Sequence, residues 1–207
     1  MTEDDLRAEV MAERREQADL LVTFRPEQWD APTLCDGWRV REVIAHTTMP
    51  FRTSFRRTLV ELAKAGGNFN RMADQCARHD AATLPPERLL AWLRDNVAHP
   101  WTPPRGGVHG ALSHDVIHGL DITVGLGLSR HVPPERVALV LAGMRPKNIA
   151  FFGTDLTKVM LQATDLDWSY GTGTPVRGLA QDLLLALCGR RLPPGRLKGE
   201  AATRFSQ

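Results

Sequence analysis

Two histidines, His114 and His118, stand four residues apart in the stretch Ala111–Ile122. If this stretch is a helix, its period places both imidazoles on one face, one turn apart. Two imidazoles at this spacing can bind one metal ion, as they do on metalloprotease helices. Asp121 follows His118 by three residues and falls on the same stripe. We expect its carboxylate either to accept a hydrogen bond from the second ring nitrogen of a ligand histidine or to form a salt bridge.

A third ligand would complete a catalytic site, because catalytic zinc usually has three protein ligands and one open position. The best candidate is His46, which ends the segment Trp38–His46, a segment with apolar residues at helical spacing. The chain between His46 and His114 is long enough to hold further helices, so the ligands could converge from two helices of a bundle. On spacing alone, a structural role for His114 and His118 is as consistent with the sequence as a metal-binding role. The presence of His46 favours metal binding. The remaining histidines, which we expect to be solvated, are His79, His99, His109 and His131.

Length and composition predict a soluble globular protein. The chain has 207 residues, of which 43% are hydrophobic and 24% charged, and its formal net charge is +2. This near balance gives no sign of a nucleic-acid partner, and no apolar run approaches the roughly 20 residues that span a bilayer. The acidic start is unlike a signal peptide, and three scattered cysteines suggest a reducing compartment. We therefore expect a cytoplasmic protein, a monomer or a homodimer, without nucleic-acid or membrane partners.

The apolar spacing predicts a mostly helical chain. Helices are predicted over residues 3–24, 38–50, 51–64, 68–79 and 85–97, around the paired histidines as far as residue 125, and from residue 133 onward. Thr2 is the expected N-cap of the first helix, and the charged run Glu13–Glu16 is expected on its solvent face. Pro50 should end or kink the second helix.

The pattern changes after about residue 146. Residues 158–164 and 166–170 are typical of strands, residues 171–175 of a turn, and residues 178–188 of a leucine-rich helix. The predicted fold class is therefore mainly α. It comprises a four-helix bundle over residues 1–145 and a small α+β unit over residues 146–207, which is too small to stand alone and should pack on the bundle.

Three stretches resemble a known family. The run Gln28–His46 is similar to the N-terminal signature of the mycothiol-dependent maleylpyruvate isomerase family, within the DinB-like superfamily. The segment His114–Ile122 is similar to that family's second metal-ligand motif, and Ala163–Gly171 resembles part of its C-terminal portion. The resemblance covers nearly the whole chain. It implies a DinB-like four-helix bundle that holds a divalent metal, usually zinc, and that uses mycothiol, the low-molecular-weight thiol of actinobacteria.

Carried over to this chain, the metal ligands that the resemblance implies are His46, His114 and His118. The chain departs from the isomerase at one of them, because the isomerase has glutamate where this chain has His114. Three histidines still suit zinc, and also nickel, but maleylpyruvate as the substrate does not carry over. A neutral imidazole in place of a carboxylate leaves the bound metal one unit more positive, which should lower the pKa of a coordinated water or thiol further.

The resemblance predicts a metal-dependent enzyme that uses mycothiol and a small electrophilic substrate, as a thiol S-transferase or a cis–trans isomerase. Two alternatives remain open: a DinB-like metal protein with another thiol or a hydrolytic activity, and a non-catalytic module in which the metal only staples the bundle. Structural zinc is normally held by four protein ligands. No fourth ligand has motif support here, which favours an enzyme.

Overall fold

The computed structural model describes residues 2–207 of the chain. The chain divides into two compact units, each described here by itself. The first comprises the chain up to Pro32 together with Asp36–His118, and the second comprises Thr33–Cys35 together with Gly119–Gln207. The expected domain boundary at residue 145 stays a prediction. None of the helices formed by residues 2–207 has the length and apolar character that crossing a membrane requires.

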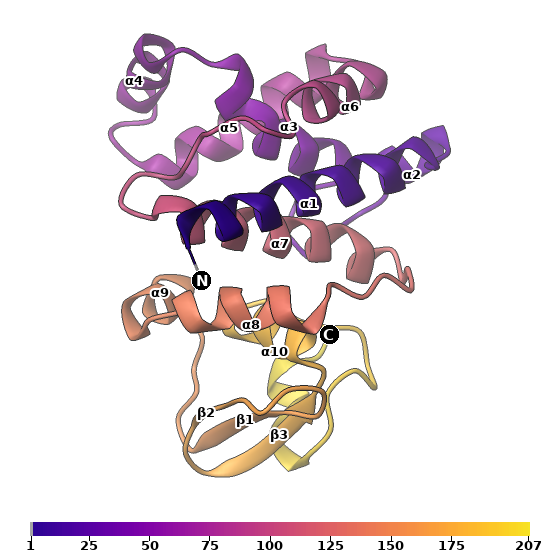
Figure 1. Ribbon diagram of the computed structural model, residues 1–207, viewed down its shortest axis with the longest axis vertical. Helices are drawn as coiled ribbons and strands as arrows, with labels where there is room; N and C mark the ends of the chain where they lie inside the picture. The colour runs from indigo at the N-terminus through magenta and orange to yellow at the C-terminus, as the bar shows by residue number, and fades with distance from the viewer. Residues whose placement is uncertain (1) are drawn as a thin grey trace. The chain divides into compact units, whose positions relative to one another are not determined.

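The first unit consists of helices (Figure 1). They are α1 (Glu3–Val22), α2 (Pro26–Trp29), α3 (Val40–Arg52), α4 (Phe55–Lys64), α5 (Phe69–Thr83), α6 (Pro86–Asp95) and the first part of α7 (Gly107–Gly125). Helix α3 packs against both α5 and α6, and α1 packs against α6. The predicted helices are thus present, and the short α2 is an addition that the sequence reading did not include.

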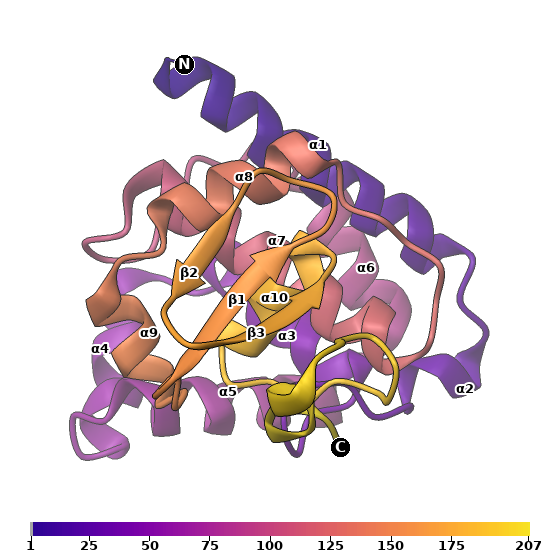
Figure 2. The same ribbon diagram turned by 90° about the horizontal axis from the view of Figure 1, so that it is seen from below.

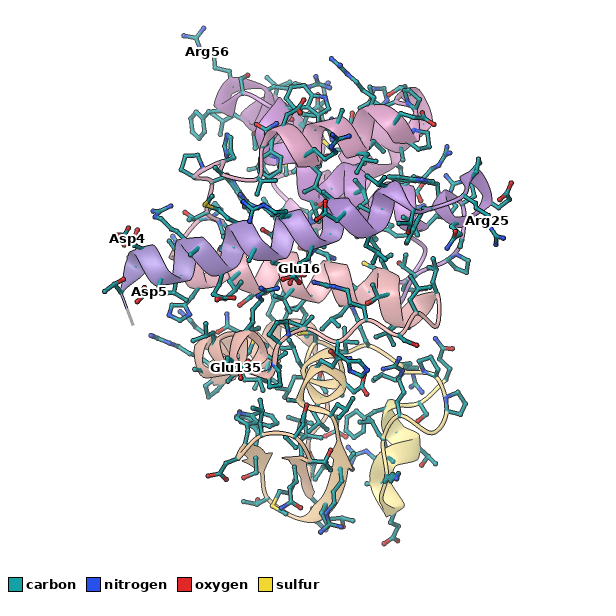
Figure 3. The ribbon with its side chains drawn as sticks, turned by 45° about the vertical axis from the view of Figure 1, so that its right-hand side comes forward. Asp4, Asp5, Glu16, Arg25, Arg56 and Glu135 are labelled. Atoms are coloured by element: carbon teal, nitrogen blue, oxygen red, sulfur yellow. The ribbon has the colours of Figure 1, made fainter. Side chains whose placement is uncertain are left out.

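Helix α1 begins with a capping box. The Asp5 backbone N–H donates to Oγ1 of Thr2 at 3.2 Å, and the Thr2 N–H donates to the Asp5 carboxylate at 2.8 Å. Figure 3 shows Asp4 and Asp5 in this first turn, where negative charge is favourable. The predicted cap is confirmed, but the predicted solvent face is wrong in part. Glu13 and Arg14 are buried, because both have polar partners inside the unit that a local pattern does not reveal.

Helix α3 starts at Val40 and continues two residues beyond Pro50. Proline lacks an N–H, so residue 50 cannot donate the usual bond to the His46 carbonyl. The guanidinium of Arg52 reaches back over this turn and donates to the Ala45 carbonyl at 2.7 Å. Arg52 also forms a largely buried ion pair with Asp80 on α5. The proline lies in the last turn, and the helix ends two residues after it rather than at it.

The second unit holds the rest of α7, α8 (Pro134–Gly143), α9 (Pro146–Phe152), the sheet and α10 (Ala180–Leu187), and ends in a short 3-10 helix (Glu200–Phe205). The sheet contains β1 (Val159–Ala163), β2 (Ser169–Gly171) and β3 (Thr174–Gly178). Strand β1 lies in the middle, antiparallel to β2 and parallel to β3 (Figure 2). Every residue of α10 is buried, and the helix packs on β1 and β3.

The third strand was not predicted, because its sequence looks like a turn. Gly171 and Gly173 both have a positive φ, and they carry the chain from β2 into β3. A Cβ at Gly173 would lie 2.3 Å from the Lys158 carbonyl, so only glycine fits there. The strand-like pattern at residues 158–164 is correct to within a residue. Helix α9 also lies outside the predicted elements.

Candidate metal centre

Three imidazoles meet within the first unit. His114 and His118 lie one turn apart on α7, and His46 comes from α3. One ring nitrogen from each residue lies within 4.8 Å of the other two. The Nε2 atoms of His46 and His114 are 3.1 Å apart. The structure therefore brings together all three histidines that the sequence singled out.

His114 is oriented by the residue that follows it. Its Nδ1 lies 2.9 Å from Oδ1 of Asp115, and the other carboxylate oxygen accepts a hydrogen bond from Nε of Arg14 at 2.7 Å. An ionised carboxylate can only accept a hydrogen bond, so Nδ1 of His114 is the donor of this pair, and the neutral ring then carries its lone pair on Nε2. That nitrogen faces His46. The arrangement is the one that prepares an imidazole for metal coordination.

The Asp115 carboxylate is itself held deep inside the unit. The side chains of Arg14 and Asp115 are 1% and 5% exposed. Nη1 of Arg14 donates to the carbonyls of His99 and Val97, at 2.7 and 3.3 Å, and its guanidinium lies over the Phe51 ring. A buried charge that is paired and hydrogen-bonded in this way has little freedom to move. The orientation of His114 is thus anchored to α1.

Two tryptophans flank the histidines. The ring of Trp38 lies 5.0 Å from that of His46 and 6.2 Å from that of His118, and its Nε1 donates to Asp74 on α5. The ring of Trp101 meets His114 edge-on at 5.3 Å. Both tryptophans pack directly on the imidazoles. Aromatic walls lower the local polarity around the three rings.

The environment keeps His46 neutral. Burial, together with the neighbouring imidazoles of His118 and His114, holds the pKa of His46 well below its usual range. Its Nδ1 is buried and has no hydrogen-bond partner. Neutral imidazoles are the form that binds metals, and a cluster of three imidazoles without a carboxylate ligand suits zinc or another borderline divalent ion. The residues present therefore fit a metal of this class.

Asp121 lies on α7, as the spacing predicted, but its described partner is not a histidine. The guanidinium of Arg190 donates to both of its carboxylate oxygens, from Nε and from Nη2, at 2.8 Å each. The side chain of Asp121 is fully buried and that of Arg190 nearly so. This ion pair, within the second unit, corresponds to the second of the two roles expected for Asp121, a salt bridge. A role for Asp121 in orienting a ligand histidine remains a prediction.

The remaining histidines lie outside the cluster. His79, His109 and His131 are exposed, as expected, and His99 is half-buried. Sequence reasoning missed Asp115 and Arg14, although they fix the orientation of His114. Asp115 carried a signal, since it is the acidic neighbour of a candidate ligand on a helix of high apolar content. Arg14 carried none, because its partner lies 101 residues away.

Comparison with known proteins agrees with the resemblance of the motifs. Residues 10–100 match the family model described as the mycothiol maleylpyruvate isomerase N-terminal domain. Two uncharacterized proteins of Mycobacterium tuberculosis, from the strains CDC 1551 / Oshkosh and ATCC 25618 / H37Rv, are each 27% identical to the chain over 221 residues. These alignments cover 90% of this chain and 84% of each relative.

Two solved structures share the fold. The crystal structure of the mycothiol-dependent maleylpyruvate isomerase superposes with a TM-score of 0.64 at 13% identity, and a histidine-to-alanine mutant of that isomerase gives 0.61 at 12%. Both matches cover 98% of this chain and 94% of the other. The predicted fold class, mainly α with a small C-terminal α+β part, is confirmed. Residues 10–100 match the mycothiol maleylpyruvate isomerase N-terminal domain, which is the family that the motifs of this chain resemble.

Proposed function

We propose that the chain is a metal-dependent enzyme that uses mycothiol, as a thiol S-transferase or a cis–trans isomerase, and that His46, His114 and His118 hold one divalent ion, zinc or nickel. The observation that carries this proposal is the approach of the His46 and His114 Nε2 atoms to 3.1 Å. Two imidazole nitrogens that share a tetrahedral zinc ion at normal bond lengths lie about 3.3 Å apart. The third imidazole stands in reach of the same point.

When bound, a divalent metal with an open coordination position would lower the pKa of a coordinated thiol and so supply the thiolate, the nucleophilic form, at neutral pH. The chain's own residues prepare the site. Asp115 holds the proton on Nδ1 of His114, which leaves the Nε2 lone pair directed at the other imidazoles. Arg14 fixes that carboxylate in place. Trp38 and Trp101 cover the rings and limit the access of water.

The family resemblance supports mycothiol as the thiol, because the matched domain and the solved structures of the same fold are named for it. Three protein ligands support catalysis over a structural role, since structural zinc sites are normally closed by four. A DinB-like protein with a different thiol or a hydrolytic activity is the competing function, and it shares the metal site.

Calorimetric titration of mycothiol into the zinc-loaded protein tests the proposal. We expect binding that depends on zinc and releases a proton, because the thiol is captured as thiolate. His114→Ala should abolish it. His109→Ala is the matched control, since this exposed histidine lies on the same helix outside the cluster, and it should bind mycothiol normally. Zinc uptake without any binding of mycothiol would refute the mycothiol proposal and favour the competing function.

A further inference from the structure

A cavity of about 300 Å³ opens in the first unit, beside the histidines. It is formed by the N-terminal half of α1, the segment that precedes α7, and the first turns of α7. Its apolar lining comes from Val10, Met11, Pro100, Trp101, Val108 and Ala111. A mostly apolar cavity of this size with a few polar groups is typical of sites for small molecules.

The charges around the cavity are uneven. Arg7 and Arg14 both line it, and no aspartate or glutamate is among its lining residues. The charge of Arg14 is matched by Asp115. His99, also in the lining, has a pKa lowered first by burial and then by Arg14, so it is neutral at neutral pH. Nη2 of Arg14 is buried without a hydrogen-bond partner and can still donate to a ligand oxygen, but Arg7 is the lining cation without a buried counter-ion.

Arg7 can exchange its present partner. It pairs with Glu3, one turn earlier on α1, at 2.6 Å, and the two side chains are 41% and 67% exposed. Exposed pairs of this kind are held weakly, because water screens both charges. A ligand carboxylate that brings its apolar body into the cavity can therefore replace Glu3 at little cost. A second carboxylate would meet Arg14, whose charge Asp115 already neutralises, the uncharged polar side chains of the lining and apolar groups, which is less favourable than pairing with Arg7.

The cavity is connected to the metal centre by shared residues. The indole of Trp101 lines the cavity and also packs edge-on against the His114 ring. Ala111, in the cavity wall, precedes His114 by three residues on α7. A molecule held here lies against the same side chain that covers a candidate metal ligand. The position is suitable for a substrate that must react close to the histidines.

We propose that this cavity binds the electrophilic second substrate, and that this substrate is a small monocarboxylate with an aromatic or branched aliphatic body. The carboxylate binds Arg7, and the body packs against Met11, Val108 and Trp101. The identification of this ligand as a substrate rests on the proposed function. Its binding to the cavity can be tested without metal or thiol. The proposal predicts that dicarboxylates bind less well than monocarboxylates.

The test is calorimetric titration of the full-length protein with three probes: 3-phenylpropionate, its neutral amide, and phenylsuccinate. We expect the monocarboxylate to bind about tenfold more tightly than the amide, since one charge-assisted hydrogen bond is worth about that factor. Phenylsuccinate should bind less well than 3-phenylpropionate. Arg7→Gln should remove the preference for the carboxylate, whereas Glu3→Gln should tighten its binding. Arg15→Gln is the matched control on α1, because Arg15 is exposed and does not line the cavity.

Two further measurements locate the probe. Nuclear Overhauser contacts between 3-phenylpropionate and the Trp101 indole are expected, and Ala111→Leu should fill the cavity and displace both the acid and the amide. If the acid and the amide bind equally, or if Arg7→Gln leaves the preference intact, the inference is wrong. A zinc titration of the same samples keeps the two proposals apart. Normal zinc uptake without probe binding overturns this inference alone, and probe binding without zinc uptake overturns the proposed function alone.

Discussion

Removing one member of the Arg14–Asp115 ion pair should lower the free energy of unfolding far more than removing both members. The pair is nearly inaccessible to water, with side chains 1% and 5% exposed. Arg14→Met leaves a buried carboxylate without its cation, and Asp115→Leu leaves a buried guanidinium without its anion. Each single change should lower the free energy of unfolding by about 3–5 kcal/mol, the usual cost of an uncompensated buried charge. For a chain of this length, that corresponds to a fall of roughly 10 °C in Tm.

The double variant Arg14→Met/Asp115→Leu removes both charges and keeps most of the volume. It should be more stable than either single variant, with a coupling energy of about 2 kcal/mol or more, because no charge is left unpaired. Full recovery is not expected, since the carbonyls of Val97 and His99 lose their donor. Metal affinity should behave differently. Without Asp115, Nδ1 of His114 has no acceptor, so zinc should bind about 10–100-fold more weakly in the double variant as well.

The assay has two parts on the same samples. Urea unfolding of the metal-free protein, followed by circular dichroism, gives the coupling energy, and competition with a zinc chelator gives the affinity. Arg15→Met, at an exposed position on the same helix, is the control for loss of an arginine. Two results would refute the reasoning: single-variant energies that simply add in the double variant, or a double variant whose zinc affinity equals that of the native protein.

Three further predictions follow from packing, backbone geometry and burial. Leu161→Ala, at a fully buried position of β1, should lower the free energy of unfolding by about 2–5 kcal/mol in urea titration, and a loss under about 1 kcal/mol would mean that α10 does not pack there. Gly173→Ala should cost about 1–3 kcal/mol in the same assay, because its Cβ would clash with the Lys158 carbonyl; an unchanged midpoint would contradict the turn geometry. Burial raises the pKa of Cys188 to about 12, so a thiol reagent at pH 8 should modify it only after unfolding, as peptide mass spectrometry can show; rapid modification of the native protein would contradict its burial.

The local spacing of residues was enough to predict most of the fold and the three candidate metal ligands. His114 and His118 share a face because the helix has a fixed period, and the apolar pattern of Trp38–His46 placed His46 on a second helix. These inferences need only neighbours along the chain. Helix α3 was predicted up to its last turn, where it continues two residues beyond Pro50.

The ion pair that orients His114, between Arg14 and Asp115, could not be predicted from local spacing. Arg14 lies in a charged run that looks solvated, and its burial depends on partners contributed by residues 97–115. A buried ion pair has no local signature, because each member looks like a surface residue until its partner is known. Strand β3 was hidden for a related reason. Its glycine-rich start resembles a turn, and only pairing with β1 makes it a strand.

The central claim is that three histidines hold one divalent metal, and a zinc titration of the metal-free protein against a competing chelator tests it most directly. We expect one zinc per chain. His46→Ala, His114→Ala and His118→Ala should each weaken binding by at least about a hundredfold, since each removes one of three ligands, while His109→Ala should bind as the native protein does. If no zinc is taken up, or if all four variants bind it with the native affinity, the three-histidine centre is refuted.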